Sequence, residues 1–440
     1  MQLTQTEYDE LKSARDNADK ARKQAVTARD KIDALLAGAE IIDPAQPGDP
    51  AWETYGTVIL RAGKPFIPHF INFSGLEDIF APNGIWTNNT VESMLDVAKA
   101  NGFNGLRITT NTVLHTAPEF RPLVNVGEYG QTTYPRTYCS GANSAWRELT
   151  VWGILDRLTA ACAERGLAFI INQHRFCTDG PEPYAWGHGD SGYIGQAPNL
   201  PAEAWITLCA KIAGRYAGMP EFMGVELHNE PHNGARWMDD LAPGYMVSGE
   251  CNWRNCVEDA VSMINEAAPD ILILVTGTDG DWTSGESTDA NANCGWGELF
   301  SAWRNPAYLP DFTMSDRIVI APHHYGPLVG SKKPYAYDPS FPDNLPAVLE
   351  DHFGFLRAAG YQFPIMLTEY GGPLGSTGDA DDAAHAEALR QYMLDRGIGG
   401  AFWAFANSAD TLVLCPDLNT LDVDPRVVDY LAPLAARSAA

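Results

Sequence analysis

The chain alternates short apolar segments with amphipathic ones, and this alternation is the sequence feature that most constrains its fold. Eight apolar segments have the length of buried strands, at 69–74, 103–109, 167–173, 222–228, 271–277, 317–323, 364–370 and 399–405. Segments with helical spacing lie between and after them, at 90–101, 145–165, 202–217, 254–267, 295–303, 345–359, 380–396 and 425–436. Such a series predicts parallel strands joined by crossover helices.

Two α/β architectures fit this alternation: an open doubly wound sheet and a closed barrel. The turn after the first strand lacks the glycine-rich pattern that binds dinucleotides in the open sheet. Polar residues also follow most of the strands, and in a barrel all these ends meet at one rim. We therefore predict an α/β fold, a (β/α)8 TIM barrel.

An N-terminal helix is expected before the barrel, over residues 3–38. Apolar residues keep alternating spacings of three and four for more than three heptads, at Leu11, Ala14, Ala18, Ala21, Ala25, Ala28, Ile32 and Leu35. This pattern predicts a coiled coil that makes a homo-oligomer, with a trimer preferred; a lone amphipathic helix lying on the main domain is the alternative. The predicted organisation is a helix over 1–40, a proline-rich linker over 41–56 and the barrel over 57–440, beginning with a short hairpin.

Charge limits the partners of this chain. The formal net charge is −26, which argues against nucleic acid and acidic membrane surfaces, whereas neutral polysaccharides remain compatible. Adaptation to a salty habitat is an alternative reading of the acidity. The sequence has no run of about 18 apolar residues that would span a membrane. Its polar N-terminus does not resemble a secretory signal peptide.

Eight cysteines are more than a reducing cytosol requires. Cys251 and Cys256 lie in one predicted loop and could form a short disulfide, and Cys139 with Cys177 is a second candidate pair. Two others, Cys162 and Cys209, fall within helical patterns and are expected to be buried free thiols. Free cysteines throughout remain an alternative. Disulfides would indicate an extracellular destination, reached by a route that the sequence leaves open.

Two glutamates stand at the ends of predicted strands. Glu230 follows Asn229 at the end of the fourth strand, and Glu369 closes the seventh. Two carboxylates that face each other across a cleft are what glycoside hydrolysis needs: one protonates the leaving oxygen and the other attacks the sugar.

Other polar residues at the strand ends fit the same chemistry. Arg107 and Tyr325 are suited to keeping Glu369 ionised, through charge and a donated hydrogen bond. Asn229 is suited to donating a hydrogen bond to a sugar 2-hydroxyl group. Further rim residues with polar side chains are His174, His323, Asn72 and Glu77.

Histidines and carboxylates at one rim raise the question of a catalytic zinc ion. Neither His-x-His nor His-Glu-x-x-His spacing occurs, and adjacent His323 and His324 diverge on a strand. We expect no metal and no cofactor.

Aromatic residues in the predicted loops suggest a groove for sugar rings. Trp403 lies near the end of the eighth strand, where it could stack on a pyranose ring or fill the core. Five more tryptophans fall in loops after strands, and each could bind a ring or pack locally: Trp86, Trp186, Trp237, Trp282 and Trp296.

Seven motifs together resemble glycoside hydrolase family 5, a retaining (β/α)8 family, over about residues 57–436. They are INFSGLE, GFNGLRI, INQHR, GVELHNEPHN, APHHYGP, MLTEYGG and AFWAF. The resemblance implies Glu230 as acid/base, Glu369 as nucleophile and Trp403 at the −1 subsite. It also implies supporting roles for Arg107, His174, Asn229, His323 and Tyr325; His323 rather than His324 fits the family's His-x-Tyr pattern.

Within the family the chain looks most like bacterial endo-β-1,4-glucanases. This implies a β-glucan substrate, no cofactor, and carboxyl groups about 5 Å apart. A β-mannanase or other β-glycanase on the same framework is an alternative, and so is a non-catalytic glycan-binding or tail-like structural protein. The N-terminal helix departs from the family pattern, and the loop over 182–199 could reshape the groove.

Overall fold

The computed structural model describes residues 51–78, 80–112, 117–125, 141–175, 202–231, 235–237, 246–247, 250–279, 294–313, 316–329, 333–406, 408 and 410–439. Several sequence predictions lie outside these residues. They are the helix over 3–38, most of the linker, Trp186, Trp282 and the Cys139–Cys177 pair.

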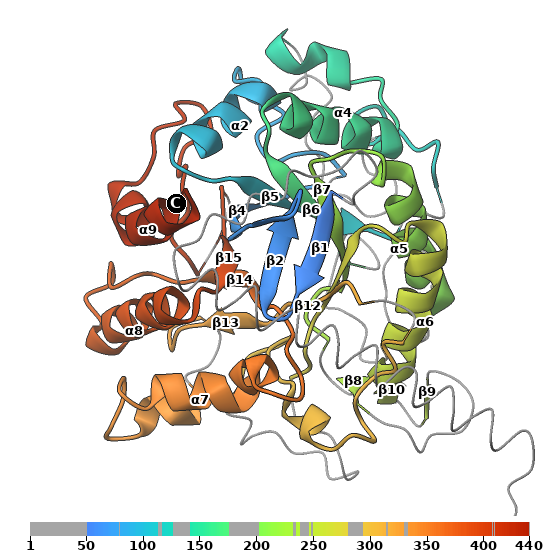
Figure 1. The fold of residues 1–440 in the computed structure, drawn as a ribbon. Helices are drawn as coiled ribbons and strands as arrows, with labels where there is room; N and C mark the ends of the chain where they lie inside the picture. The colour runs from blue at the N-terminus through green and yellow to red at the C-terminus, as the bar shows by residue number, and fades with distance from the viewer. Residues whose placement is uncertain are drawn as a thin grey trace, which may run out of the picture.

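Nine parallel strand segments form one sheet that curls into a barrel (Figure 1). Their order around the sheet is β12-β11-β7-β6-β5-β4-β15-β14-β13. The segments are β4 (His69–Phe73), β5 (Gly105–Asn111), β6 (Ala168–Arg175), β7 (Phe222–His228), β11 (Leu272–Val275), β12 (Ile318–Ile320), β13 (His323–Tyr325), β14 (Met366–Gly371) and β15 (Gly399–Phe402). All eight predicted strands are present, and the predicted barrel is confirmed.

The sixth predicted strand is split into β12 and β13, and this strand closes the barrel. Ala321 donates its backbone N–H to Val275 on β11, while Pro322 accepts from Thr368 N on β14. Consecutive residues of one chain segment therefore bond both neighbouring strands. Pro322 has no backbone N–H to donate, which accounts for the interruption of the ladder there.

Helices surround the barrel on its outer face, as Figure 1 shows. They are α2 (Val91–Ala100), α4 (Val151–Glu164), α5 (Ala202–Tyr216), α6 (Trp253–Ala267), α7 (Leu345–His352), α8 (Ala380–Arg396) and α9 (Pro425–Ser438). In the fifth crossover a helix was predicted over 295–303, but within the described residues 294–313 the helical structure is limited to the short 3-10 turn η5 (Ser301–Arg304). Among the described helices, none has the length and apolarity needed to cross a bilayer.

Local capping explains where several of these helices begin and end. Thr90 and Thr150 precede α2 and α4, and each hydroxyl accepts a backbone N–H three residues on. Asp379 caps α8 in the same way, and Gly397 ends that helix in the left-handed region, with φ of 63°. These are the side chains and the glycine position that favour helix termini.

A small antiparallel sheet covers the N-terminal end of the barrel. It comprises β1 (Trp52–Tyr55), β2 (Val58–Arg61) and β3 (Lys64–Pro65), and lies in front of the barrel strands in Figure 1. Trp52 and Ile59 pack with apolar residues of the barrel interior, and Trp52 is only 1% exposed. The predicted linker boundary is therefore corrected: from Trp52 onward the chain belongs to the barrel, because its indole is buried there.

The barrel interior changes character along its axis. Its N-terminal half is filled by apolar side chains, including Phe70, Ile170, Met223, Leu274 and Met366. Towards the C-terminal ends of the strands the buried interior becomes polar, with residues such as Asn72, Arg107, Asn172, Glu226 and Thr368. Buried polar groups need hydrogen-bond partners, so this half of the barrel is organised by side-chain pairing rather than by apolar packing.

Remaining predictions about cysteines and the small strands are partly resolved. Cys162 and Cys209 are buried free thiols, as expected. Cys251 lies on β10 (Glu250–Asn252), in a small sheet with β8 (Ala235–Arg236) and β9 (Met246–Val247), and Cys256 is buried on α6. The disulfide between these last two stays a prediction.

Candidate active site

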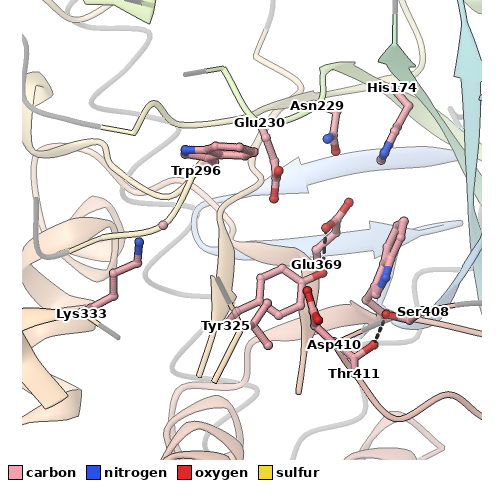
Figure 2. Close-up of a pocket in the computed structure, with 13 residues that line it drawn as sticks. His174, Asn229, Glu230, Trp296, Tyr325, Lys333, Glu369, Ser408, Asp410 and Thr411 are labelled. Atoms are coloured by element: carbon pink, nitrogen blue, oxygen red, sulfur yellow. Dashed lines mark hydrogen bonds between the residues drawn. The ribbon is translucent and has the colours of Figure 1, made fainter. Parts of the chain in front are cut away.

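A pocket of about 400 Å³ opens at the C-terminal ends of the barrel strands. Figure 2 shows Glu230 and Glu369 reaching into it from opposite sides. Seven residues singled out from the sequence line it: His174, Asn229, Glu230, Trp296, Tyr325, Glu369 and Trp403. The other lining residues are Gly295, Val329, Lys333, Ser408, Asp410 and Thr411.

The two glutamates form a close pair. A carboxylate oxygen of Glu230 lies within 4.8 Å of one of Glu369, and both are near the ring of His323. Glu369 sits within β14, in register with His323 on β13. Glu230 directly follows Asn229 beyond β7 and has φ of 44°, a conformation that non-glycine residues seldom adopt. Backbone strain of this kind is concentrated at functional positions.

Glu369 is held by three side chains. Arg107 Nη1 donates to its Oε1 at 2.6 Å, and the Tyr325 hydroxyl donates to its Oε2 at 2.7 Å. His323 Nδ1 lies 3.5 Å from Oε2. Burial and the nearby Glu230 raise the pKa of Glu369 above its ordinary value, although His323, Arg107 and Tyr325 oppose the rise by stabilising the ionised form. Tyr325 stays protonated, because burial and Glu369 raise its pKa well above the usual range.

Arg107 is fully buried and uses all five of its N–H donors. Besides Glu369, it donates to both oxygens of Glu226, to Asn72 Oδ1 and to Asn229 Oδ1, at 2.5 to 2.9 Å. An arginine has exactly this number of donors. The guanidinium is therefore locked in one orientation, and it holds four neighbouring side chains in place.

His323 connects the two candidate catalytic glutamates. Its Nδ1 lies 2.9 Å from Glu230 Oε1 and 3.5 Å from Glu369 Oε2. On the other side of the ring, its Nε2 lies 3.5 Å from Glu226 Oε1. Burial alone would lower the pKa of His323, but Glu369, Glu226 and Glu230 together raise it to about 9. The ring is an imidazolium at neutral pH, with N–H groups on both sides.

Asn229 and His174 are oriented by partners outside the pocket. Because Arg107 only donates, the Asn229 atom that faces it must be the amide oxygen, which leaves the Asn229 amide nitrogen for a ligand. His174 Nδ1 lies 2.9 Å from Asn172 Oδ1, and its ring stacks on Trp403 with centroids 5.9 Å apart. Burial, then Arg107, lowers the pKa of His174 well below 6.5, so its ring is neutral.

Four predicted contact residues do not line the pocket, and these predictions are corrected. Asn72 is fully buried; its amide donates to backbone carbonyls of β14 and β15 while its oxygen accepts from Arg107. Glu77 folds back onto Gly75 N and the Thr109 hydroxyl. Trp237 is 1% exposed and packs in an aromatic core cluster, whereas Trp86 packs against the main hydrophobic core. Only Trp296, half exposed at 51%, lines the pocket among the described loop tryptophans.

Two buried glutamates were missed by sequence reasoning. Glu226 sits between Val225 and Leu227 in β7, and Glu298 lies in the segment before η5; each is at most 1% exposed. A charged residue inside an apolar strand was the available signal for Glu226, since an unpaired buried charge is costly. No local pattern marked Glu298.

Glu298 organises the wall behind the pocket. Its Oε1 accepts from His324 Nδ1 at 2.8 Å and from His352 Nδ1 at 2.7 Å, and its Oε2 accepts from Gly295 N at 2.6 Å. His324 Nε2 in turn lies 2.9 Å from His385 Nε2 on α8. The side chain of His324 therefore points away from the pocket, and His323 is the histidine that reaches the glutamates.

Glu230, His323 and Glu369 also have donor atoms close enough to surround a cation. Glu369, Glu226 and Glu230 raise the pKa of His323 to about 9, so a metal ion would have to displace the ring proton in order to bind there.

A barrel whose C-terminal rim holds two facing carboxylates has the arrangement that glycoside hydrolysis requires. The model of the family described as Cellulase (glycosyl hydrolase family 5) matches residues 61–409. The chain belongs to this family.

Characterised relatives agree with this assignment. The chain is 27% identical over 363 residues to an endoglucanase of Paenibacillus polymyxa, covering 82% of this chain and 81% of the relative. It is 29% identical over 332 residues to the major extracellular endoglucanase of Xanthomonas campestris, covering 75% of this chain and 59% of the relative.

Solved structures show the same fold. The catalytic domain of the major endoglucanase from Xanthomonas campestris superposes with a TM-score of 0.70 at 26% identity, covering 88% of this chain and 99% of that domain. A hyperthermophilic endocellulase from Pyrococcus horikoshii has a TM-score of 0.69 at 24% identity, covering 89% of this chain and 100% of that chain. The second likeness is evidence for the fold alone.

Proposed function

We propose that this protein is an endo-β-1,4-glucanase that hydrolyses internal bonds of β-1,4-glucans with retention of configuration. The observation that carries the proposal is the Glu230–Glu369 pair, with oxygens within 4.8 Å in a family 5 barrel. Retaining glycosidases have carboxyl groups about 5 Å apart, whereas inverting enzymes need a wider gap for water. The endoglucanase names of the relatives support this substrate class.

In the first step Glu369 attacks the anomeric carbon. The bond to the leaving oxygen breaks as Glu230 gives that oxygen its proton, and a glycosyl ester on Glu369 remains. Arg107 and Tyr325 hold the attacking carboxylate in position through their hydrogen bonds to its two oxygens. His323, at 2.9 Å from Glu230, orients the acid.

In the second step Glu230, now a carboxylate, removes a proton from water. The resulting oxygen nucleophile attacks the same anomeric carbon from the face that the leaving group vacated, and Glu369 is released. Two inversions give net retention. Asn229, whose oxygen is held by Arg107, has its amide nitrogen free to donate to the sugar 2-hydroxyl.

Two aromatic residues of the pocket lining suit a chain of pyranose rings. Trp403 stacks on His174, and Trp296 is half exposed near Glu230 (Figure 2). We assign Trp403 to the ring that is attacked and Trp296 to the leaving portion. Lys333 and Asp410 add hydrogen-bonding groups to the same pocket.

The test compares reducing-sugar release from carboxymethyl-cellulose, barley β-glucan, mannan and xylan by wild type and Glu369→Gln. We expect activity on the two glucans, and a loss of at least about 10³-fold in the variant, because a neutral amide cannot form the glycosyl ester. Proton NMR of the first-formed anomer is expected to show retention.

Other outcomes change the proposal in defined ways. Activity on mannan alone would keep the mechanism and replace the substrate. Glucan hydrolysis that survives in Glu369→Gln would refute the assigned nucleophile. Silence on all four polymers with retained binding would indicate a glycan-binding protein.

We also propose an extracellular site of action. The Xanthomonas campestris relative is described as extracellular, and a cellulose-type polymer cannot enter a cell. Activity assays on separated culture medium and cell lysate of a native producer, with a cytosolic marker enzyme as control, test this proposal; activity confined to the lysate would contradict it.

A further inference from the structure

We propose that Glu226 is a positioning residue for the reaction: it holds Arg107 against Glu369, lies 3.5 Å from His323 Nε2, and balances the charge of both cations. This inference rests on the proposed function, because it concerns how the same two glutamates are kept reactive. Glu226 does not line the pocket and is fully buried, so it acts only through other side chains.

Glu226 contacts three side chains, those of Arg107, Thr368 and His323. Its Oε2 accepts from Arg107 Nε at 2.5 Å, and its Oε1 accepts from Arg107 Nη2 at 2.9 Å. The Thr368 hydroxyl donates to Oε1 at 3.1 Å, and His323 Nε2 lies 3.5 Å from the same oxygen. The carboxylate thus contacts both cations of the site from the side away from the pocket.

This two-point contact decides the orientation of Arg107. A guanidinium bound through both Nε and Nη2 cannot rotate about its own axis, so its remaining donors are aimed at Glu369, Asn72 and Asn229. Without Glu226, two buried donors would lose their acceptors. The guanidinium would then be free to shift relative to the nucleophile.

Charge balance is the second part of the argument. Two cations, Arg107 and His323, face the ionised Glu226 and Glu369, with Glu230 beside them. Burial alone would raise the pKa of Glu226, but Arg107 and His323 hold it below its ordinary value, so Glu226 remains a fixed negative charge during catalysis. The titratable and charged groups facing this cluster are Arg107 from β5, His174 from β6, Glu230 after β7, His323 and Tyr325 from β13, and Glu369 from β14.

Removing one negative charge from such a cluster favours the deprotonated form of every neighbour. In Glu226→Gln, we therefore expect both limbs of the kcat/KM pH profile to move to lower pH, by about one unit. At pH 7, kcat is expected to fall by about 100-fold, since small misplacements of reacting groups have effects of that size. KM is expected to stay within about twofold, because the pocket lining is unchanged.

Two control variants distinguish this role from a purely structural one. Asp156→Asn removes the same single charge from an ion pair with Arg215 on the outer face of the barrel, and the limbs should not move. Glu226→Asp keeps the charge but moves it back by about one carbon–carbon bond. Its pH limbs should stay at the wild-type positions, while kcat falls because Arg107 is less well oriented.

Each result bears on the inference separately from the proposed function. Unmoved limbs in a folded Glu226→Gln protein would overturn it, as would full activity of folded Glu226→Asp at 25 °C. If the Gln variant does not fold, the Asp variant alone decides, through its kcat against its KM. A wild-type protein inactive on every glucan would instead refute the proposed function.

Discussion

At the scale of single residues, the site is a cluster in which each charge depends on its neighbours. Arg107 and Glu369 are 262 positions apart in the chain, yet a 2.6 Å hydrogen bond joins them. The sequence predicted their pairing because an arginine in an apolar strand needs a partner. It did not predict that Arg107 also donates hydrogen bonds to Glu226 and Asn72, because several acceptors near the strand ends could have taken that place.

The pH dependence of activity follows from Glu369. Its pKa is raised above the ordinary 4.5 by burial, and only the ionised carboxylate can attack. Activity is therefore expected to be lost as pH falls through a value above 4.5. A kcat/KM profile from pH 3 to 9 on a soluble glucan measures this limb.

Tyr325→Phe tests the assignment of that acid limb to Glu369. The variant lacks the hydrogen bond to Glu369 Oε2, which stabilises the ionised form, so its acid limb should lie at higher pH than in wild type. An acid limb well below pH 4 in wild type would contradict the role of burial.

At the scale of elements, the segment before η5 is held to the barrel by a buried carboxylate rather than by a helix. The fifth crossover was expected to be helical, but Glu298 anchors this segment to β13 and α7 through His324 and His352. Its other oxygen holds Gly295 N, next to Trp296. Periodicity could not reveal this element, because its stability comes from long-range hydrogen bonds.

Glu298→Gln is expected to destabilise the fold by about 2–4 kcal/mol, because an amide cannot accept two imidazole donors and a backbone N–H equally well. The two histidines, through charge and hydrogen bonds, lower the pKa of Glu298 despite its burial. A depressed pKa gives stability that is fully present above the unfolded-state value and is lost as pH falls.

The measurement is urea unfolding of wild type and variant at several pH values. The difference between them should be full at pH 7 and should shrink below about pH 4. A difference that grows on acidification would contradict the assigned ionisation. Glu350→Gln is a control, since Glu350 pairs with Arg396 on the partly exposed surface, where ion pairs contribute little.

At the scale of the whole molecule, the barrel has an apolar end that is sealed and a polar end that carries the pocket. The antiparallel sheet β1–β2–β3 covers the sealed end, where Trp52 enters the interior cluster and its Nε1 donates to Pro220 O at 2.9 Å. The two ends have different tasks: one contributes stability, and the other contributes chemistry.

Trp52→Ala is expected to cost about 3–5 kcal/mol of stability, the range for a large buried aromatic residue. Activity per folded molecule should be unchanged at 25 °C, because the substitution lies at the opposite end of the barrel from the pocket. Thermal unfolding and active-site titration together measure this. A loss of kcat without a loss of stability would contradict the separation of the two ends.

The heptad pattern over residues 3–38 predicts an oligomer, with a trimer preferred. Multi-angle light scattering of the full chain and of a variant starting at residue 51 tests it. We expect the full chain to be an oligomer and the shortened one a monomer with unchanged kcat. A full chain that is monomeric at micromolar concentration would refute the coiled coil.

The sequence by itself determined the barrel and the pair of candidate catalytic glutamates. Strand and helix periodicity are local properties, and Glu230 and Glu369 each follow an apolar strand, so both signals could be read along the chain. The tertiary structure alone decided which neighbours serve those glutamates. Trp237 and Trp296 were both predicted to lie in loops after strands, but Trp237 is buried in the core and Trp296 lines the pocket. The physical reason is that burial and charge pairing depend on residues brought together by barrel closure, and no local pattern encodes those neighbours.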